Sequence, residues 1–114
     1  MTQQMITRRF GRTELAMPVL TCGGMRFQQS WKDLPPEDIG DECQANVEAI
    51  VHRSLDLGIN HFETARGYGS SEEQLGRVLP NLPREQMIVQ TKVGPREDPK
   101  EFLGMFEESM KNLK

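Results

Sequence analysis

Long apolar runs, a strong net charge and paired cysteines are all missing from this 114-residue sequence. No apolar run approaches the roughly 18 residues that a bilayer-spanning helix needs, and the N-terminus lacks the apolar stretch of a secretion signal. The net charge is −3, which gives no reason to expect nucleic acid or an anionic membrane as a partner. We therefore expect a cytoplasmic protein that binds neither nucleic acid nor membrane.

Cysteine is scarce, and the two residues present, Cys22 and Cys43, form no Cys-x-x-Cys pair. Their number and spacing suit a reducing cytoplasm, and we favour two small buried apolar residues over a disulfide. The Gly-x-Gly-x-x-Gly fingerprint of a doubly wound dinucleotide-binding domain is also absent. Charged residues make up 27% of the chain and hydrophobic residues 36%, which is the balance of a globular protein.

The apolar pattern predicts a β-hairpin followed by alternating strands and helices. Residues 8–10 and 15–17 are expected to pair as the hairpin, with Gly11 in its turn. The order that follows is βαβαβα, with strands expected at residues 19–22, 59–65 and 87–93. Strands that alternate with amphipathic helices indicate a parallel sheet covered by helices, either doubly wound or closed into a (β/α)8 barrel.

Each predicted helix begins at a residue that can cap it. Asp41 with Gln44, and Ser70 with Glu73, have the spacing of a capping box, and Asp98 precedes a proline. Apolar residues at helical spacing then predict the buried faces: Cys43, Val47, Ile50, Val51 and Leu55 in the first helix, Leu75, Val78 and Leu79 in the second, and Phe102, Leu103, Phe106, Met110 and Leu113 in the third.

Three parallel strands would leave two unpaired sheet edges and helices with nothing to complete their packing. An intact (β/α)8 barrel needs about 250 residues. We therefore interpret residues 1–114 as a single, partial domain.

The densest group of polar side chains lies in residues 58–72. Side chains alternate between the two faces of a strand, so apolar residues facing the helices at 62 and 89 leave Glu63 and Lys92 pointing inward. Both would lie near the carboxyl ends of neighbouring strands, where barrel active sites are found. Tyr68 follows directly, in the loop above.

These three residue types suit proton donation. A phenol titrates near pH 10, too high for a good donor at neutral pH, and an ammonium ion close to it favours the phenolate. A carboxylate paired with the ammonium holds it in place and keeps it charged. Tyr68, Lys92 and Glu63 together would form a general acid able to protonate a carbonyl oxygen as hydride arrives. The alternative is a purely structural ion pair, which the presence of Tyr68 disfavours.

Residues 58–72, which read Gly-Ile-Asn-His-Phe-Glu-Thr-Ala-Arg-Gly-Tyr-Gly-Ser-Ser-Glu, resemble the signature of the aldo-keto reductase family. In that signature a strand ends in Asp-Thr-Ala and a tyrosine follows five residues after the acid. The strand end at residues 91–93 resembles the catalytic-lysine strand of the family, and residues 8–13 and 22–26 resemble its hairpin and first βα loop. The resemblance covers nearly the whole chain and implies the hairpin and first three βα units of an incomplete (β/α)8 TIM barrel.

The resemblance also implies an activity, the reduction of aldehydes and ketones with NADPH or, in some members, NADH. Tyr68 would be the acid, Lys92 would favour its ionisation, and Glu63 would stand where the family usually has aspartate. Some bacterial members with a C-terminal iron–sulfur segment share the Glu-Thr-Ala-Arg-Gly-Tyr-Gly motif, so an iron–sulfur cluster outside this sequence is left open.

Five residues are predicted to contact the cofactor: Gly23, Gly24, Met25, Arg26 and Glu63. The two glycines could instead simply end a strand, and we favour a close approach of their backbone to the cofactor. No metal site is predicted, because His61 and Glu63 share a strand face without a third ligand. His61 is expected to be an interior residue hydrogen-bonded to Gln90.

The leading hypothesis is therefore an NADPH-dependent reductase of small carbonyl compounds, with the 114-residue chain inactive by itself. The fourth catalytic residue of the family, a histidine after the fourth strand, has no counterpart here, since His52 lies in the first predicted helix and His61 in the second strand. The alternative is a cofactor-binding regulatory subunit of the same fold. Protein partners and the identity of the substrate are not predicted.

Overall fold

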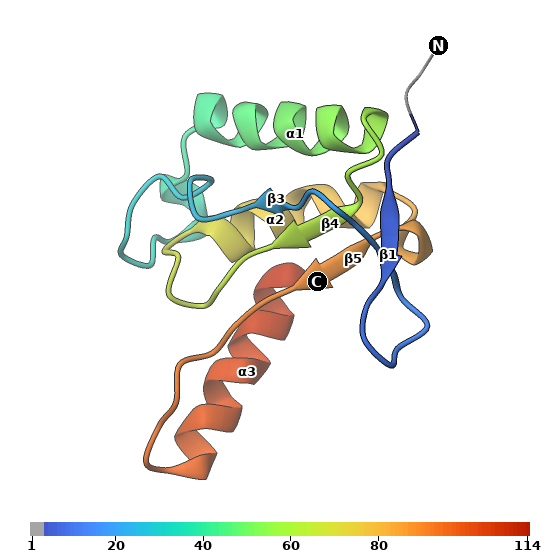
Figure 1. The fold of residues 1–114 in the computed structure, drawn as a ribbon. Coiled ribbons are helices and arrows are strands. Elements are labelled where there is room, and N and C mark those ends of the chain that lie inside the picture. The colour runs from blue at the N-terminus through green and yellow to red at the C-terminus, as the bar shows by residue number, and fades with distance from the viewer. Residues whose placement is uncertain (1–3) are drawn as a thin grey trace.

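The computed structural model describes residues 4–114 and begins with the predicted hairpin. Strand β1 (Thr7–Arg9) pairs antiparallel with β2 (Ala16–Pro18). The turn between them contains Gly11, whose φ of +56° lies in the left-handed region that glycine adopts readily. The hairpin prediction is confirmed, and Figure 1 shows the hairpin beside the end of the sheet at which the parallel strands begin.

Three parallel strands form the sheet, in the order β3 (Cys22–Gly23), β4 (His61–Glu63) and β5 (Ile88–Gln90). They are shorter than predicted, although backbone hydrogen bonds continue past β4 and β5: Thr64 N–H donates to Gln90 O at 2.8 Å, and Arg66 N–H to Lys92 O at 2.9 Å. The prediction that the first strand starts at residue 19 is wrong, because pairing with β4 begins only at Cys22.

Helices α1 (Asp41–Asp56), α2 (Ser71–Val78) and α3 (Pro99–Leu113) follow the three strands in turn. Short 3₁₀ turns lie before α1 and between α2 and β5, at Pro36–Asp38, Leu79–Asn81 and Arg84–Gln86. In Figure 1, α1 runs along one side of the sheet and α2 lies behind the strands. Across residues 4–114, no helix combines the length and the apolar character needed to cross a membrane.

Of the three predicted helix caps, one is misplaced, one lacks its side-chain bond and one is confirmed. Asp41 is the first residue of α1, and Gly40, with extended backbone, occupies the capping position without a side-chain bond. Ser70 does precede α2, but its backbone (φ −80°, ψ 1°) is not extended, so its hydroxyl does not reach the helix N–H groups. The cap at Asp98 is confirmed, because its carboxylate accepts a hydrogen bond from Lys100 N–H at 2.9 Å.

The core lies between the sheet and helices α1 and α2. Val47 and Val51 of α1 are buried as predicted, whereas Ile50 is exposed. Phe62 of β4 and Leu75 of α2 are completely buried. The other buried apolar residues that pack with them are Phe27, Val78, Leu79, Met87 and Leu113.

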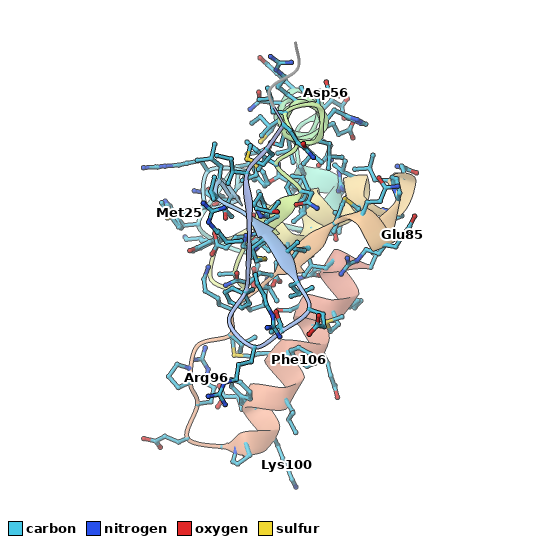
Figure 2. The ribbon with its side chains drawn as sticks, turned by 45° about the vertical axis from the view of Figure 1, so that its right-hand side comes forward. Met25, Asp56, Glu85, Arg96, Lys100 and Phe106 are labelled. Atoms are coloured by element: carbon cyan, nitrogen blue, oxygen red, sulfur yellow. The ribbon has the colours of Figure 1, made fainter. Side chains whose placement is uncertain are left out.

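Helix α3 departs most from its predicted packing. Phe102, Leu103, Phe106 and Met110 are exposed, and only Leu113 of the predicted apolar stripe is buried. The reason is that α3 docks by its last turns alone, where its backbone passes so close to Gly76 of α2 that a Cβ there would lie 1.8 Å from Asn112 O. Figure 2 shows Lys100, in the first turn of α3, at the end of this helix that projects away from the sheet and the other helices.

An apolar groove of about 570 Å³ separates the exposed side of α3 from the hairpin. Its apolar lining comes from four elements: Phe10, Leu15 and Met17 of the hairpin region, Leu79 of the 3₁₀ turn after α2, Ile88 and Val89 of β5, and Phe106, Met110 and Leu113 of α3. The groove runs along the outer edge of β5, the last strand of the described sheet.

Candidate active site

Glu63 and Lys92 form an ion pair at the carboxyl ends of β4 and β5. The strand register brings them together, since Glu63 pairs with Gln90 and the Arg66 N–H binds Lys92 O one step further along. The Lys92 ammonium also donates a hydrogen bond to Thr64 O at 3.1 Å. The inward orientation predicted from strand parity therefore matches the structure.

Tyr68 joins this pair from the loop after β4. The Lys92 Nζ atom lies 4.8 Å from the centroid of the Tyr68 ring, within the range of a cation–π contact. Two consecutive turns hold the tyrosine, because its N–H donates to Ala65 O and its carbonyl accepts from Ser71 N–H, each at 3.0 Å. The structure thus gathers the three predicted catalytic residues into one contiguous group.

Burial lowers the pKa of the Lys92 ammonium from its usual value of 10.5. The Glu63 carboxylate opposes this change, because a nearby negative charge favours the protonated amine. The Lys92 side chain remains 44% exposed, so water screens both effects.

The loop after β3 carries the other predicted cofactor contacts. Gly24 N–H donates to Glu63 O at 2.6 Å, and a Cβ at Gly24 would lie only 2.8 Å from that carbonyl. Close packing on β4 therefore accounts for glycine at this position without any ligand. Gly23, Met25 and Arg26 are exposed, and a Cβ at Gly23 would sit 3.9 Å from Glu63 Oε2, at an ordinary contact distance.

A buried serine connects this loop to α2. The Ser71 hydroxyl donates to Gly24 O at 2.8 Å and is bonded to the Thr64 hydroxyl at 2.8 Å. Both Ser71 and Thr64 are completely buried. This hydroxyl therefore ties the first βα loop to the end of β4 and the start of α2.

Sequence reasoning missed the most buried charge of the region, Glu72 in the first turn of α2. Its side chain has no exposed surface and pairs with Arg66, whose Nη1 lies 3.1 Å from Glu72 Oε2. Arg66 also pairs with Asp33 of the first βα loop. Burial acts to lower the pKa of Arg66, but hydrogen bonds and charges from Asp33 and Glu72 raise it overall.

The histidines lie apart from this chemistry. His61 Nε2 is 3.1 Å from Gln90 Oε1, which confirms the predicted bond, and His61 Nδ1 is 2.8 Å from the Thr21 hydroxyl. His52 is exposed on α1. Cys22 and Cys43 are half-buried free thiols. Among residues 4–114, no three histidine, cysteine or acidic side chains gather as a metal site.

The sequence from residue 19 to residue 114 matches the model of the Aldo/keto reductase family. The chain belongs to this family. The match includes β3 to β5 and all three residues of the candidate site. The predicted fold class, a hairpin and the first three βα units of an incomplete barrel, is confirmed by likeness to solved members.

A structure from Pseudomonas aeruginosa assigned to the aldo-keto reductases covers 99% of this chain, with a TM-score of 0.71 and 30% identity. L-glyceraldehyde 3-phosphate reductase of Escherichia coli K12 is 32% identical over 98 residues, which cover 80% of this chain. The NADH-specific methylglyoxal reductase of the same organism is 54% identical over 39 residues, 32% of this chain and 12% of that protein. The chain spans 25% of the length of the first reductase and 46% of the solved structure.

Proposed function

We propose that this aldo-keto reductase chain supplies the proton-donating half of an NADPH-dependent reductase of small aldehydes and ketones. The observation that carries the proposal is the contact of one ammonium group, that of Lys92, with both Glu63 and Tyr68. NADH is the alternative cofactor, and the 54% identical relative is named for its specificity for NADH.

The residues at this edge of the sheet fit one end of a nicotinamide cofactor. Gly23 has no side chain above the Glu63 carboxylate, and Met25 and Arg26 are exposed beside it. An exposed cation such as Arg26 suits a phosphate-bearing ligand. We therefore assign Gly23, Met25, Arg26 and Glu63 to cofactor contacts, whereas the buried Gly24 only packs this loop against β4.

In the proposed reaction, the carbonyl carbon would receive hydride from NADPH when the cofactor is bound. Tyr68 gives its phenolic proton to the carbonyl oxygen, so that the product is an alcohol and the tyrosine is left as phenolate. The Lys92 ammonium stabilises that phenolate, since opposite charges at short range favour ionisation. Glu63 holds the ammonium in place and keeps it protonated.

The apolar groove beside α3 supports the proposal that residues 1–114 form part of a larger barrel. Phe106 and Met110 are large apolar residues left exposed along the outer edge of β5. We expect the 114-residue chain alone to show no turnover and a barrel that contains it to be active. We further propose a cytoplasmic location, which suits two free cysteines.

The test uses a completed barrel, defined here as residues 1–114 joined to the remaining βα units of the Pseudomonas aeruginosa relative. Reduction of methylglyoxal is followed by the loss of NADPH absorbance. Tyr68→Phe should lower turnover by about 10²- to 10⁴-fold, the usual contribution of a general acid. NADPH binding, measured by nicotinamide fluorescence, should remain because the phenol is not among the proposed cofactor contacts.

Lys92→Met should lower turnover to a similar degree, and its matched control is Lys100→Met on the exposed start of α3. The control should retain the parent rate. Unchanged turnover in the Tyr68→Phe barrel would show that another group donates the proton and would overturn the proposal.

A further inference from the structure

We propose that Glu72 is a positioning residue for Tyr68 and Lys92, whose buried carboxylate fixes the chain segments that carry them. The inference rests on the proposed function for its catalytic meaning, since it concerns the same site. Glu72 lies in the first turn of α2 and points away from solvent, with no exposed surface. A buried carboxylate costs free energy unless its oxygens are fully bonded, so its partners define what it does.

Three donors converge on this one carboxylate. Thr91 Oγ1 donates to Glu72 Oε1 at 2.6 Å, and Arg66 Nη1 donates to Glu72 Oε2 at 3.1 Å. Asn112 Nδ2 of α3 lies 3.4 Å from the same Oε2 atom. The partners come from three separate segments, the extensions of β4 and β5 and the last turn of α3.

Two of these partners lie within two residues of the candidate catalytic residues in the chain. Thr91 is the neighbour of Lys92 in the chain, and Arg66 lies two residues before Tyr68. The two segments are also joined at the backbone, where Arg66 N–H donates to Lys92 O at 2.9 Å. Glu72 therefore closes a ring that runs through Thr91, Lys92 and Arg66 and returns to its own carboxylate.

Arg66 extends this network of bonds around Glu72 to the first βα loop. Its guanidinium lies between the buried Glu72 and the exposed Asp33, and only 11% of its side chain is exposed. With the charge of Glu72 removed, this guanidinium would keep only a solvent-facing partner. Because a glutamine presents an N–H as well as an oxygen, it cannot accept from both Thr91 and Arg66 as the carboxylate does. A glutamine at this position therefore keeps the shape of the side chain but loses the negative charge that faces Arg66 and one of the two acceptor oxygens.

The test is amide hydrogen exchange in the 114-residue chain. Glu72→Gln should speed exchange of the Arg66 N–H by at least about tenfold, because the side-chain bonds that hold this backbone pair are lost. The internal reference is the Ile88 N–H, which donates to Asn60 O at 2.9 Å at the opposite end of the same strand pair. The matched control is Glu73→Gln, whose half-buried carboxylate pairs with Arg77 instead.

The inference holds if the Arg66 amide responds to Glu72→Gln and the Ile88 amide and the control variant do not. Equal acceleration of both amides would mean that Glu72 only stabilises the fold, and the inference would be wrong. If Glu72→Gln does not fold, Thr91→Val decides by the same comparison, since it removes one donor and keeps the volume of the side chain.

Kinetics of the completed barrel connect this result to catalysis. Glu72→Gln should lower kcat at least about tenfold and leave the KM for NADPH within about twofold, whereas Glu73→Gln should leave both unchanged. An unchanged kcat in the Glu72→Gln barrel would show that Glu72 does not position the catalytic residues and would overturn this part of the inference. A parent barrel without turnover would refute the proposed function instead, and amide exchange would still decide whether Glu72 positions these segments.

Discussion

The Lys92 ammonium stands over the ring of Tyr68, 4.8 Å from its centroid, while its ion-pair partner is Glu63. One amine thus links a strand carboxylate to a loop phenol. The protonation state of this amine affects both contacts. A measurement of the Lys92 pKa therefore tests the geometry of the site without a measurement of turnover.

Lys92 should titrate below 10.5, because burial lowers the pKa of its ammonium. Glu63→Gln should lower this pKa further by removing the opposing negative charge. Carbon-13 NMR of the reductively methylated chain measures it, with Lys92→Arg assigning the signal. A rise in the pKa on Glu63→Gln would contradict the assigned pairing.

The free energy of unfolding should depend on pH through the same group. Because the folded-state pKa is below the unfolded value, the unfolded chain binds more protons between the two values. The stability that Lys92 contributes therefore rises with pH across the interval that ends at 10.5; it is fully present above that value and is lost as the pH falls through the folded-state pKa. Urea unfolding of the parent and of Lys92→Met at several alkaline pH values should show a steeper rise for the parent.

Gly69→Ala should destabilise the chain by about 2 kcal/mol or more, the sum of left-handed backbone strain and overpacking. Gly69 has a φ of +53°, and a Cβ there would lie 1.7 Å from Ser30 O. The control is Gly67→Ala, where no atom lies within 4 Å of the added carbon and φ is not positive. Urea denaturation should show the control neutral or more stable by about 0.5 kcal/mol; equal losses would contradict the close approach at Ser30.

Gly76→Ala should loosen α3 from α2, because the added carbon would lie 1.8 Å from Asn112 O. The expected loss is about 1–3 kcal/mol, as for other overpacked sites. Gly104→Ala is the matched control inside α3, with nothing within 4 Å, and should stabilise the chain by about 0.5–1 kcal/mol. If both substitutions stabilise the chain, α3 does not pack as closely on α2 at Gly76 as the structure shows.

The two sides of α3 should respond differently to loss of apolar surface. Phe106→Ser and Met110→Ser should leave the free energy of unfolding within about 1 kcal/mol, because both side chains are exposed. They should also weaken binding of an apolar dye, since both line the groove. Leu113→Ala, at a buried position, should cost about 2–5 kcal/mol. Dye binding that is unaffected by the serine changes would place the apolar surface elsewhere.

The geometry of the site could be predicted where it follows from regular backbone. Side chains alternate along a strand by construction, so the inward direction of Glu63 and Lys92 and the bond between His61 and Gln90 could be inferred from parity. Helix faces were predicted well where a sheet covers them, as for Val47 and Val51.

Features that depend on the surroundings could not be predicted in this way. Periodicity marks an apolar face of α3 but does not say what covers it, and Phe106 is exposed. Capping depends on the backbone angles of the preceding loop, which Ser70 illustrates. The bonds of Glu72 could not be predicted, because its three partners lie 6, 19 and 40 residues away in the sequence and come together only in the folded chain.

The buried Ser71 hydroxyl has one proton, and it goes to Gly24 O. The Thr64 hydroxyl must then donate to the Ser71 oxygen, so the two bonds point the same way, from β4 toward the first βα loop. Aligned bonds of this kind polarise one another. Replacing the Thr64 hydroxyl by a methyl group, as in Thr64→Val, would therefore weaken the bond from Ser71 to Gly24 O. A change on β4 would in this way alter the first βα loop, although the two segments are far apart in the sequence.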